Sequence, residues 1–206
     1  MIVTETPERR PAVTDTPHLT ERQNLDEVIR LIHLGLTVFG VLALVTGLWA
    51  GDYKRVHHLG FSLHKWIGLT LTFFMAWRIW NGFFGAPEAL FSQWVPYSIE
   101  RLKMVWVDGL TLLRLKLPER PAHQGLAGLV QTFGLAVFAW MAGTGSLMAL
   151  FLTPGHKAGG FVHAIKEAHE LGLWLIVTFL LIHVGAVILH ALAGNHLWRR
   201  MFFLEK

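Results

Sequence analysis

Histidine is the residue type in this sequence best suited to chemistry. The chain has 206 residues, of which 12 are histidine and none is cysteine. The lack of cysteine excludes disulfides, thiolate metal sites, iron–sulfur clusters and covalently attached c-type haem. A histidine inside a long apolar run is costly unless it is paired, hydrated or bound to a cofactor. Five histidines lie in or at such runs: His33, His64, His169, His183 and His190.

The other seven histidines lie outside the apolar runs or at their edges. We expect solvation to account for those in tails and loops, and one at the mouth of the third run could serve either role. The loop and tail histidines are His18, His57, His58, His156, His163 and His196, and the residue at the mouth is His123.

Four apolar runs must position the five candidates. They cover about residues 28–50, 63–79, 125–152 and 168–193, and each is close to or longer than the roughly 20 residues that a helix needs to cross a bilayer. The runs are continuous rather than alternating, and they are too long for barrel strands. With 53% hydrophobic and 16% charged residues, the sequence predicts an all-α integral membrane protein built as a bundle of four transmembrane helices.

The predicted organisation is a single membrane domain with short ends. We expect a polar N-terminal tail at 1–27 without a cleavable signal peptide, the membrane domain at 28–201 and a C-terminal tail at 202–206. Residues 82–121 are too polar for a span and predict a cytoplasmic amphipathic connector between the second and third helices. This connector either lies at the membrane interface or offers a docking surface to a partner.

The basic residues predict how the chain threads the membrane. Thirteen of the 18 Lys and Arg residues fall on one side of a four-span arrangement and five on the other. Because basic residues collect on the cytoplasmic side, both termini are expected there. This rule also accounts for the net charge of +4, so we expect no nucleic-acid partner.

The spacing of the histidines predicts two separate cofactors. His169 and His183 lie fourteen positions apart, which places them on one helix face but about 21 Å apart along the axis. That distance is too long for one metal and suits two stacked haems, each of which needs two axial ligands from facing helices. Antiparallel threading brings His64 to the depth of His169 near the periplasmic surface, and His33 to that of His183 near the cytoplasmic surface.

Two alternatives stay open at this point. His190, seven positions beyond His183, lies on nearly the same face and could replace it as a ligand, or mark a quinone site. The histidines could instead only hydrogen-bond across the bundle. Lys65 and Arg78, at opposite ends of the second run, could contact haem propionates or simply reach the interfaces.

Three segments resemble one known family. They are "RLIHLGLTVFGVLALVTG" (30–47), "HKWIGLTLTFFMAWRIWNGF" (64–83) and "HELGLWLIVTFLLIHVGAVILHALAGNHLWRRM" (169–201). They are similar to helices of the prokaryotic cytochrome b561 and nickel-hydrogenase b-type cytochrome superfamily. The resemblance runs from about residue 30 to residue 201. His33 is followed by Leu where many members have Trp, and His123 by Gln where a related group has Asn-Pro, which blurs the subfamily.

The resemblance implies a cofactor set and a function. It implies two b haems whose iron is ligated by His33, His64, His169 and His183, and thus favours His183 over His190. Members pass electrons between the quinone pool and a periplasmic redox protein: a dehydrogenase, a hydrogenase or a c-type cytochrome. We therefore expect an electron-transfer subunit of an oxidoreductase complex, in contact with membrane lipid and with no catalytic side chain of its own.

Two other functions compete with this expectation. A stand-alone superoxide:quinone oxidoreductase would use basic residues on the outer side to steer a small anion. A haem-free transporter would use the paired histidines differently, although no broken helix or inverted repeat supports it. The basic residues that the superoxide alternative would use are Lys54, Arg55, Lys65 and Lys166.

Overall fold

The protein is all-helical throughout the part of the chain that the structure describes. This computed structural model describes residues 17–50, 58–118, 124–153 and 155–204. Four long helices form the body of the molecule, and four short elements lie at one end of it. The long helices are α1 (Pro17–Trp49), α2 (Leu59–Phe84), α5 (Leu126–Phe151) and α6 (Gly160–Leu192), and the short ones are η1 (Pro87–Ala89), α3 (Phe91–Trp94), α4 (Ile99–Leu113) and α7 (Leu197–Met201).

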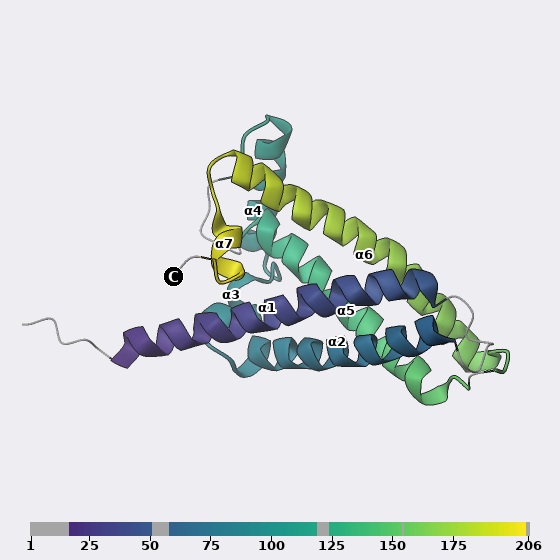
Figure 1. The fold of residues 1–206 in the computed structure, drawn as a ribbon. Helices are drawn as coiled ribbons and strands as arrows, with labels where there is room; N and C mark the ends of the chain where they lie inside the picture. The colour runs from purple at the N-terminus through teal and green to yellow at the C-terminus, as the bar shows by residue number, and fades with distance from the viewer. Residues whose placement is uncertain (1–16, 51–57, 119–123, 154, 205–206) are drawn as a thin grey trace, which may run out of the picture.

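The long helices form two antiparallel hairpins that pack against each other. α1 packs along α2, α5 packs along α6, and α2 joins the two hairpins through its contacts with α5. Figure 1 shows α1 and α6 diverging towards the end of the bundle where α7 lies. Each hairpin therefore consists of two consecutive long helices. The candidate histidines of α1 and α2 can meet those of α6 only where the two hairpins face each other.

Three of the long helices are long and apolar enough to cross a membrane. They are α1 from Glu27 onwards, α5 and α6, and only 11%, 17% and 11% of their most apolar windows are buried. Apolar side chains that face outwards suit a lipid environment rather than water. The first, third and fourth predicted runs are thus confirmed as apolar helices in a membrane protein.

The second predicted run forms α2, but α2 does not belong to that set of three. Its 26 residues give a length of about 39 Å at about 1.5 Å per residue, which is sufficient for a span. Its sequence also holds His64, Lys65, Arg78 and Asn81, which reduce its apolar character. The four-span architecture therefore stays a prediction.

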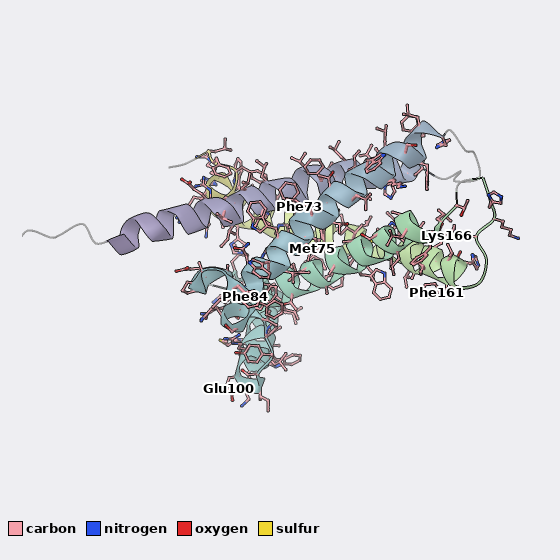
Figure 2. All side chains as sticks on the ribbon, turned by 90° about the horizontal axis from the view of Figure 1, so that it is seen from below. Phe73, Met75, Phe84, Glu100, Phe161 and Lys166 are labelled. Atoms are coloured by element: carbon pink, nitrogen blue, oxygen red, sulfur yellow. The ribbon has the colours of Figure 1, made fainter. Side chains whose placement is uncertain are left out.

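The bundle has a narrow core. Ile32 and Met75 are almost completely buried, whereas Phe73, two residues before Met75 on α2, is 62% exposed (Figure 2). Gly35 lies against the ring of Phe74, so a side chain there would collide with the ring. The helices approach closely through such small residues, which is common in membrane bundles.

The predicted connector at 82–121 is largely helical in its described part. Its first residues continue α2, and the η1–α3–α4 segment then projects from the end of the bundle, with Glu100 far from the body in Figure 2. On α4, Ile99, Trp106 and Leu113 expose large apolar side chains, as the amphipathic prediction requires. The buried Asp108 accepts a hydrogen bond from the Leu126 backbone N–H at 3.0 Å and so caps the start of α5.

The two segments predicted as tails contain helix or contact it in their described parts. α1 begins at Pro17, so helix extends into the segment 1–27. At the other end, the guanidinium of Arg30 lies 4.1 Å from the centre of the Phe203 ring. The last described residues therefore fold back onto α1.

Candidate cofactor-binding site

The structure brings four of the five candidate histidines together as two pairs. The rings of His64 on α2 and His169 on α6 have centres 6.0 Å apart and an interplanar angle of 73°. We call these the loop-side pair, because both lie near the connections that close the two hairpins. The rings of His33 on α1 and His183 on α6 are 6.5 Å apart at 50°, and we call them the terminus-side pair.

Hydrogen bonds determine which nitrogen of His64 carries its proton. The Nδ1 atom lies 2.9 Å from the Ala43 carbonyl oxygen and 3.5 Å from the Thr46 hydroxyl. That hydroxyl donates its own hydrogen to the Leu42 carbonyl at 2.7 Å, so towards His64 it can only accept. Nδ1 of His64 is therefore the protonated nitrogen, and Nε2 is left free to bind a metal.

His169 is held in the same way from the other hairpin. Its Nδ1 atom lies 2.9 Å from the Thr144 hydroxyl, and the His169 ring also forms a hydrogen bond with the Met141 backbone. The Thr144 hydroxyl donates to the Trp140 carbonyl at 2.7 Å. The free nitrogen of His169 is thus also Nε2.

A glycine follows each of these threonines and admits the histidine ring. A Cβ atom at Gly47 would lie 3.1 Å from Cε1 of His64, and one at Gly145 would lie 3.2 Å from Cε1 of His169. Any side chain at either position would therefore press on the ring. The two glycines leave room for rings that approach the backbone of the neighbouring helix.

The terminus-side pair has a different environment. The ring of His183 stacks on Phe179 at 5.2 Å, and the ring of His33 meets the edge of Phe202 at 5.6 Å. Nδ1 of His33 is buried and has no hydrogen-bond partner among the described residues. A buried polar atom of this kind is costly unless it has a partner, which favours a ligand at this pair.

Both pairs have the ring separation expected for bis-histidine metal ligation. An imidazole nitrogen binds a first-row metal at about 2 Å, and the ring centre lies about 1 Å further, so two such rings sit about 6 Å apart. The observed 6.0 Å and 6.5 Å agree with this value. No group of three or more His, Asp or Glu side chains forms a metal site within the described ranges. A pair is sufficient when a porphyrin supplies the remaining four nitrogens, so these residues fit b-type haem.

The remaining predicted site residues lie elsewhere. Arg78 is half-buried between the rings of Phe91 and Trp94, at 5.3 and 5.4 Å, and donates to the Ala89 carbonyl at 3.4 Å. These contacts attach the connector to α2, and a bond to a haem propionate stays a prediction. Lys65 lies over the ring of Trp66 at 5.7 Å, and its propionate contact is likewise a prediction.

His190 is not part of either pair. Its ring is half-buried near the end of α6, and within the described residues no ring contact joins it to another histidine. The ring that faces His33 belongs to His183.

The loop histidines behave as ordinary polar residues where they are described. Nδ1 of His58 accepts from the Phe61 N–H at 3.2 Å and caps α2. His163 is exposed and lies 3.8 Å from Glu167. His57, His123 and the side chain of His18 lie outside the described residues.

Sequence reasoning did not identify the side chains that surround the histidines. Thr46 and Thr144 bind the loop-side rings, and Phe179 and Phe202 contact the terminus-side rings. A Thr-Gly dipeptide near the end of both the first and the third apolar run was a signal for the threonines. For the two phenylalanines, the sequence holds no comparable signal among its 14 Phe residues.

The whole membrane domain matches one protein family. The model of the family described as prokaryotic cytochrome b561 matches residues 24–204. No curated protein and no solved structure matches the chain. Family membership implies binding of b-type haem and electron transfer in a membrane, in agreement with the paired histidines and the apolar helices. The chain belongs to the prokaryotic cytochrome b561 family.

Proposed function

We propose that this protein carries two b haems and passes electrons between a periplasmic redox protein and the quinone pool. One haem binds between His64 and His169, and the other between His33 and His183. The donor is a dehydrogenase, a hydrogenase or a c-type cytochrome. The chain is the membrane cytochrome b subunit of such a system in the bacterial inner membrane, with both termini in the cytoplasm.

The observation that carries this proposal is the presence of two cross-helix histidine pairs in one apolar bundle. Each pair has the ring separation that a shared iron requires. The two ligands on α6 are separated by about 21 Å at about 1.5 Å per residue. The pairs thus divide the roughly 30 Å of hydrocarbon between them, which suits a path from one side of the membrane to the other.

Haem b, when bound, supplies a one-electron carrier at each pair. At each pair, the chain's own part is to hold two neutral imidazoles in a fixed orientation and to exclude water. At the loop-side pair, hydrogen bonds from the two hairpins orient the rings. At the terminus-side pair, the rings of Phe179 and Phe202 surround the histidines with apolar surface.

This proposal requires α2 to be the fourth span. α2 runs along α1 and also packs on α5, so it shares the length of the bundle with two helices that are apolar enough to cross. Lys65 lies near one end of α2 and Arg78 near the other, where long basic side chains reach the interfaces or haem propionates. His64 and Asn81 are the polar residues that a bundle interior tolerates when they have partners.

We place the quinone site at the terminus side, near His190. The ring of His190 is half-buried and is outside both histidine pairs. A histidine at that position can hydrogen-bond a quinone carbonyl and exchange a proton with the cytoplasmic side. The proposed electron path would then end next to the terminus-side haem.

The superoxide alternative has less support from the described residues. Attraction of the superoxide anion would depend on unpaired positive charge. The Lys166 ammonium, however, is paired with Glu170 at 2.5 Å and with Glu167 at 3.4 Å. Lys54 and Arg55 lie outside the described residues. Membership of a b-type cytochrome family also favours bound haem over the haem-free transporter.

The decisive experiment counts the haems. Detergent-purified protein, expressed with haem available, should show an oxidised-minus-reduced spectrum of b-type haem and two haems per chain by the pyridine haemochrome method. With haem present, reduction of the protein by a quinol in liposomes tests the link to quinone. A folded protein without haem, or with one haem per chain, would overturn the two-haem proposal.

A further inference from the structure

The two hairpins hold the loop-side histidines by the same arrangement of residues. On α1, Thr46 and Gly47 contact His64 of the following long helix. On α5, the dipeptide Thr144-Gly145 contacts His169 of the following long helix in the same way. Each hairpin thus supplies one histidine from its second helix and one Thr-Gly dipeptide from its first helix.

The correspondence extends to individual hydrogen bonds. Each threonine donates to the carbonyl four residues earlier at 2.7 Å and lies 3.3 Å from the carbonyl three residues earlier. In each hairpin the histidine also forms a hydrogen bond with the backbone of the residue that carries this second carbonyl, Ala43 or Met141. The repeated unit therefore comprises the dipeptide, one backbone group and one histidine.

The correspondence between the two hairpins does not extend to the terminus side when their sequences are aligned. When Thr46 is aligned with Thr144, His33 corresponds to Gln131. When His64 is aligned with His169, His183 corresponds to Arg78. The terminus-side pair therefore occurs once, on one side of the bundle, whereas the loop-side pair joins two equivalent positions.

We propose that the Thr46-Gly47 and Thr144-Gly145 dipeptides are matched positioning elements for the loop-side haem, an inference that rests on the proposed function. Each hydroxyl accepts from Nδ1 of its histidine and so fixes the tautomer in which Nε2 binds iron. Each glycine lets the ring approach the helix backbone. The two hairpins would thus hold the two ligands of the loop-side haem through residues of the same kind.

Ordinary helix back-bonding by threonine does not account for this arrangement. Thr132 and Thr178 also donate to the carbonyl four residues earlier, at 2.8 Å each. Within the described residues, neither of them forms a hydrogen bond with a histidine. The contact with Nδ1 separates Thr46 and Thr144 from threonines that only satisfy their own hydroxyl groups.

The two threonines should contribute unequally. Thr144 lies 2.9 Å from its histidine, whereas Thr46 lies 3.5 Å away and shares the N–H with the Ala43 carbonyl at 2.9 Å. A hydrogen bond from Nδ1–H makes an imidazole more basic and favours ferric iron. Removing the hydroxyl should therefore raise the midpoint potential of the loop-side haem, and more so for Thr144.

The test is a redox titration of the purified two-haem protein and its Thr144→Val, Thr46→Val and double variants, with Thr144→Ser as the rescue. Thr132→Val on the same helix is the matched control. His64→Ala identifies which potential belongs to the loop-side haem. Electron paramagnetic resonance of the oxidised protein reports ligand orientation independently of activity.

We expect Thr144→Val to raise one of the two potentials and to change the g-values of that haem alone. Thr46→Val should give a smaller shift in the same direction, and Thr144→Ser should stay close to the parent. Thr132→Val should change neither haem. The proposal is wrong if Thr144→Val moves neither haem, moves both equally, or is matched by Thr144→Ser. A parent protein without two haems would instead overturn the proposed function.

Discussion

Each histidine pair takes one of its two residues from α6, yet the surroundings of the two pairs differ. The loop-side rings donate hydrogen bonds to the hydroxyl groups of Thr46 and Thr144. The terminus-side pair is lined by Phe179 and Phe202, and the buried Nδ1 of His33 has no partner in the described part of the chain. The first pair is polar and nearly symmetric, and the second is apolar and asymmetric.

If both pairs bind haem as proposed, this difference would give the two haems different potentials. A hydrogen-bonded imidazole is the more basic ligand and stabilises ferric iron, whereas an apolar pocket disfavours the additional positive charge. The loop-side haem should therefore have the lower potential. Electron flow from the loop side to the terminus side is then downhill, which agrees with the proposed direction from the periplasm to the quinone site.

Loss of a ligand should have the largest effect and would separate the two sites. His64→Ala should remove the loop-side haem and His183→Ala the terminus-side haem, and each should reduce the haem content from two to about one per chain. His190→Ala is the control and should retain both haems. The pyridine haemochrome assay gives the count, and loss of a haem from the His190 variant would show that the terminus-side ligand is misassigned.

Opening the apolar site should have the next largest effect. Phe202→Ala exposes His33 at the end of the bundle, and water should stabilise the ferric form. We expect the terminus-side potential to fall by on the order of 100 mV, a small part of the roughly 0.8 V over which proteins tune haem. Redox titration measures the shift, with the exposed Leu204→Ala as the control. A change confined to the loop-side haem would contradict this description.

The intact protein should itself show the difference between the sites. A hydrogen bond contributes about 1 kcal/mol, which corresponds to on the order of 40 mV for one electron. The loop-side haem should titrate at least that far below the terminus-side haem. Separate redox titrations of the His64→Ala and His183→Ala proteins assign the two midpoint potentials. A loop-side potential above the terminus-side potential would contradict the proposed difference between the sites.

The smallest expected effect comes from the glycines. Gly145→Ala should displace the His169 ring by a few tenths of an ångström, whereas Gly143→Ala, on the same helix, meets no atom within 4 Å. Alanine favours a helix by about 1 kcal/mol over glycine, so Gly143→Ala should raise the melting temperature of the haem-bound protein. Gly145→Ala should lack that gain and alter the electron paramagnetic resonance spectrum. Equal behaviour of the two variants would contradict the close approach of the His169 ring.

The pairing of the histidines was predicted from the sequence, whereas the side chains that contact them were not. The helix period placed His169 and His183 on one face, and antiparallel threading paired them with His64 and His33, as the ring contacts in the structure now have them. Their role as haem ligands stays a prediction. The contacts of Arg78 with Phe91 and Trp94 were missed, because they depend on how the connector folds back on α2.

A helical membrane protein with histidines near both ends of its bundle could be predicted from the sequence alone. Long apolar runs admit few other folds, and the rise per residue converts spacing into depth. The groups that surround each histidine became known only from the packing of the helices in the structure. The hydrogen bond from His169 to the Thr144 hydroxyl and the contact of Phe202 with His33 depend on the rotation and approach of separate helices. Those quantities arise from packing between elements and are not encoded in the period of any one helix.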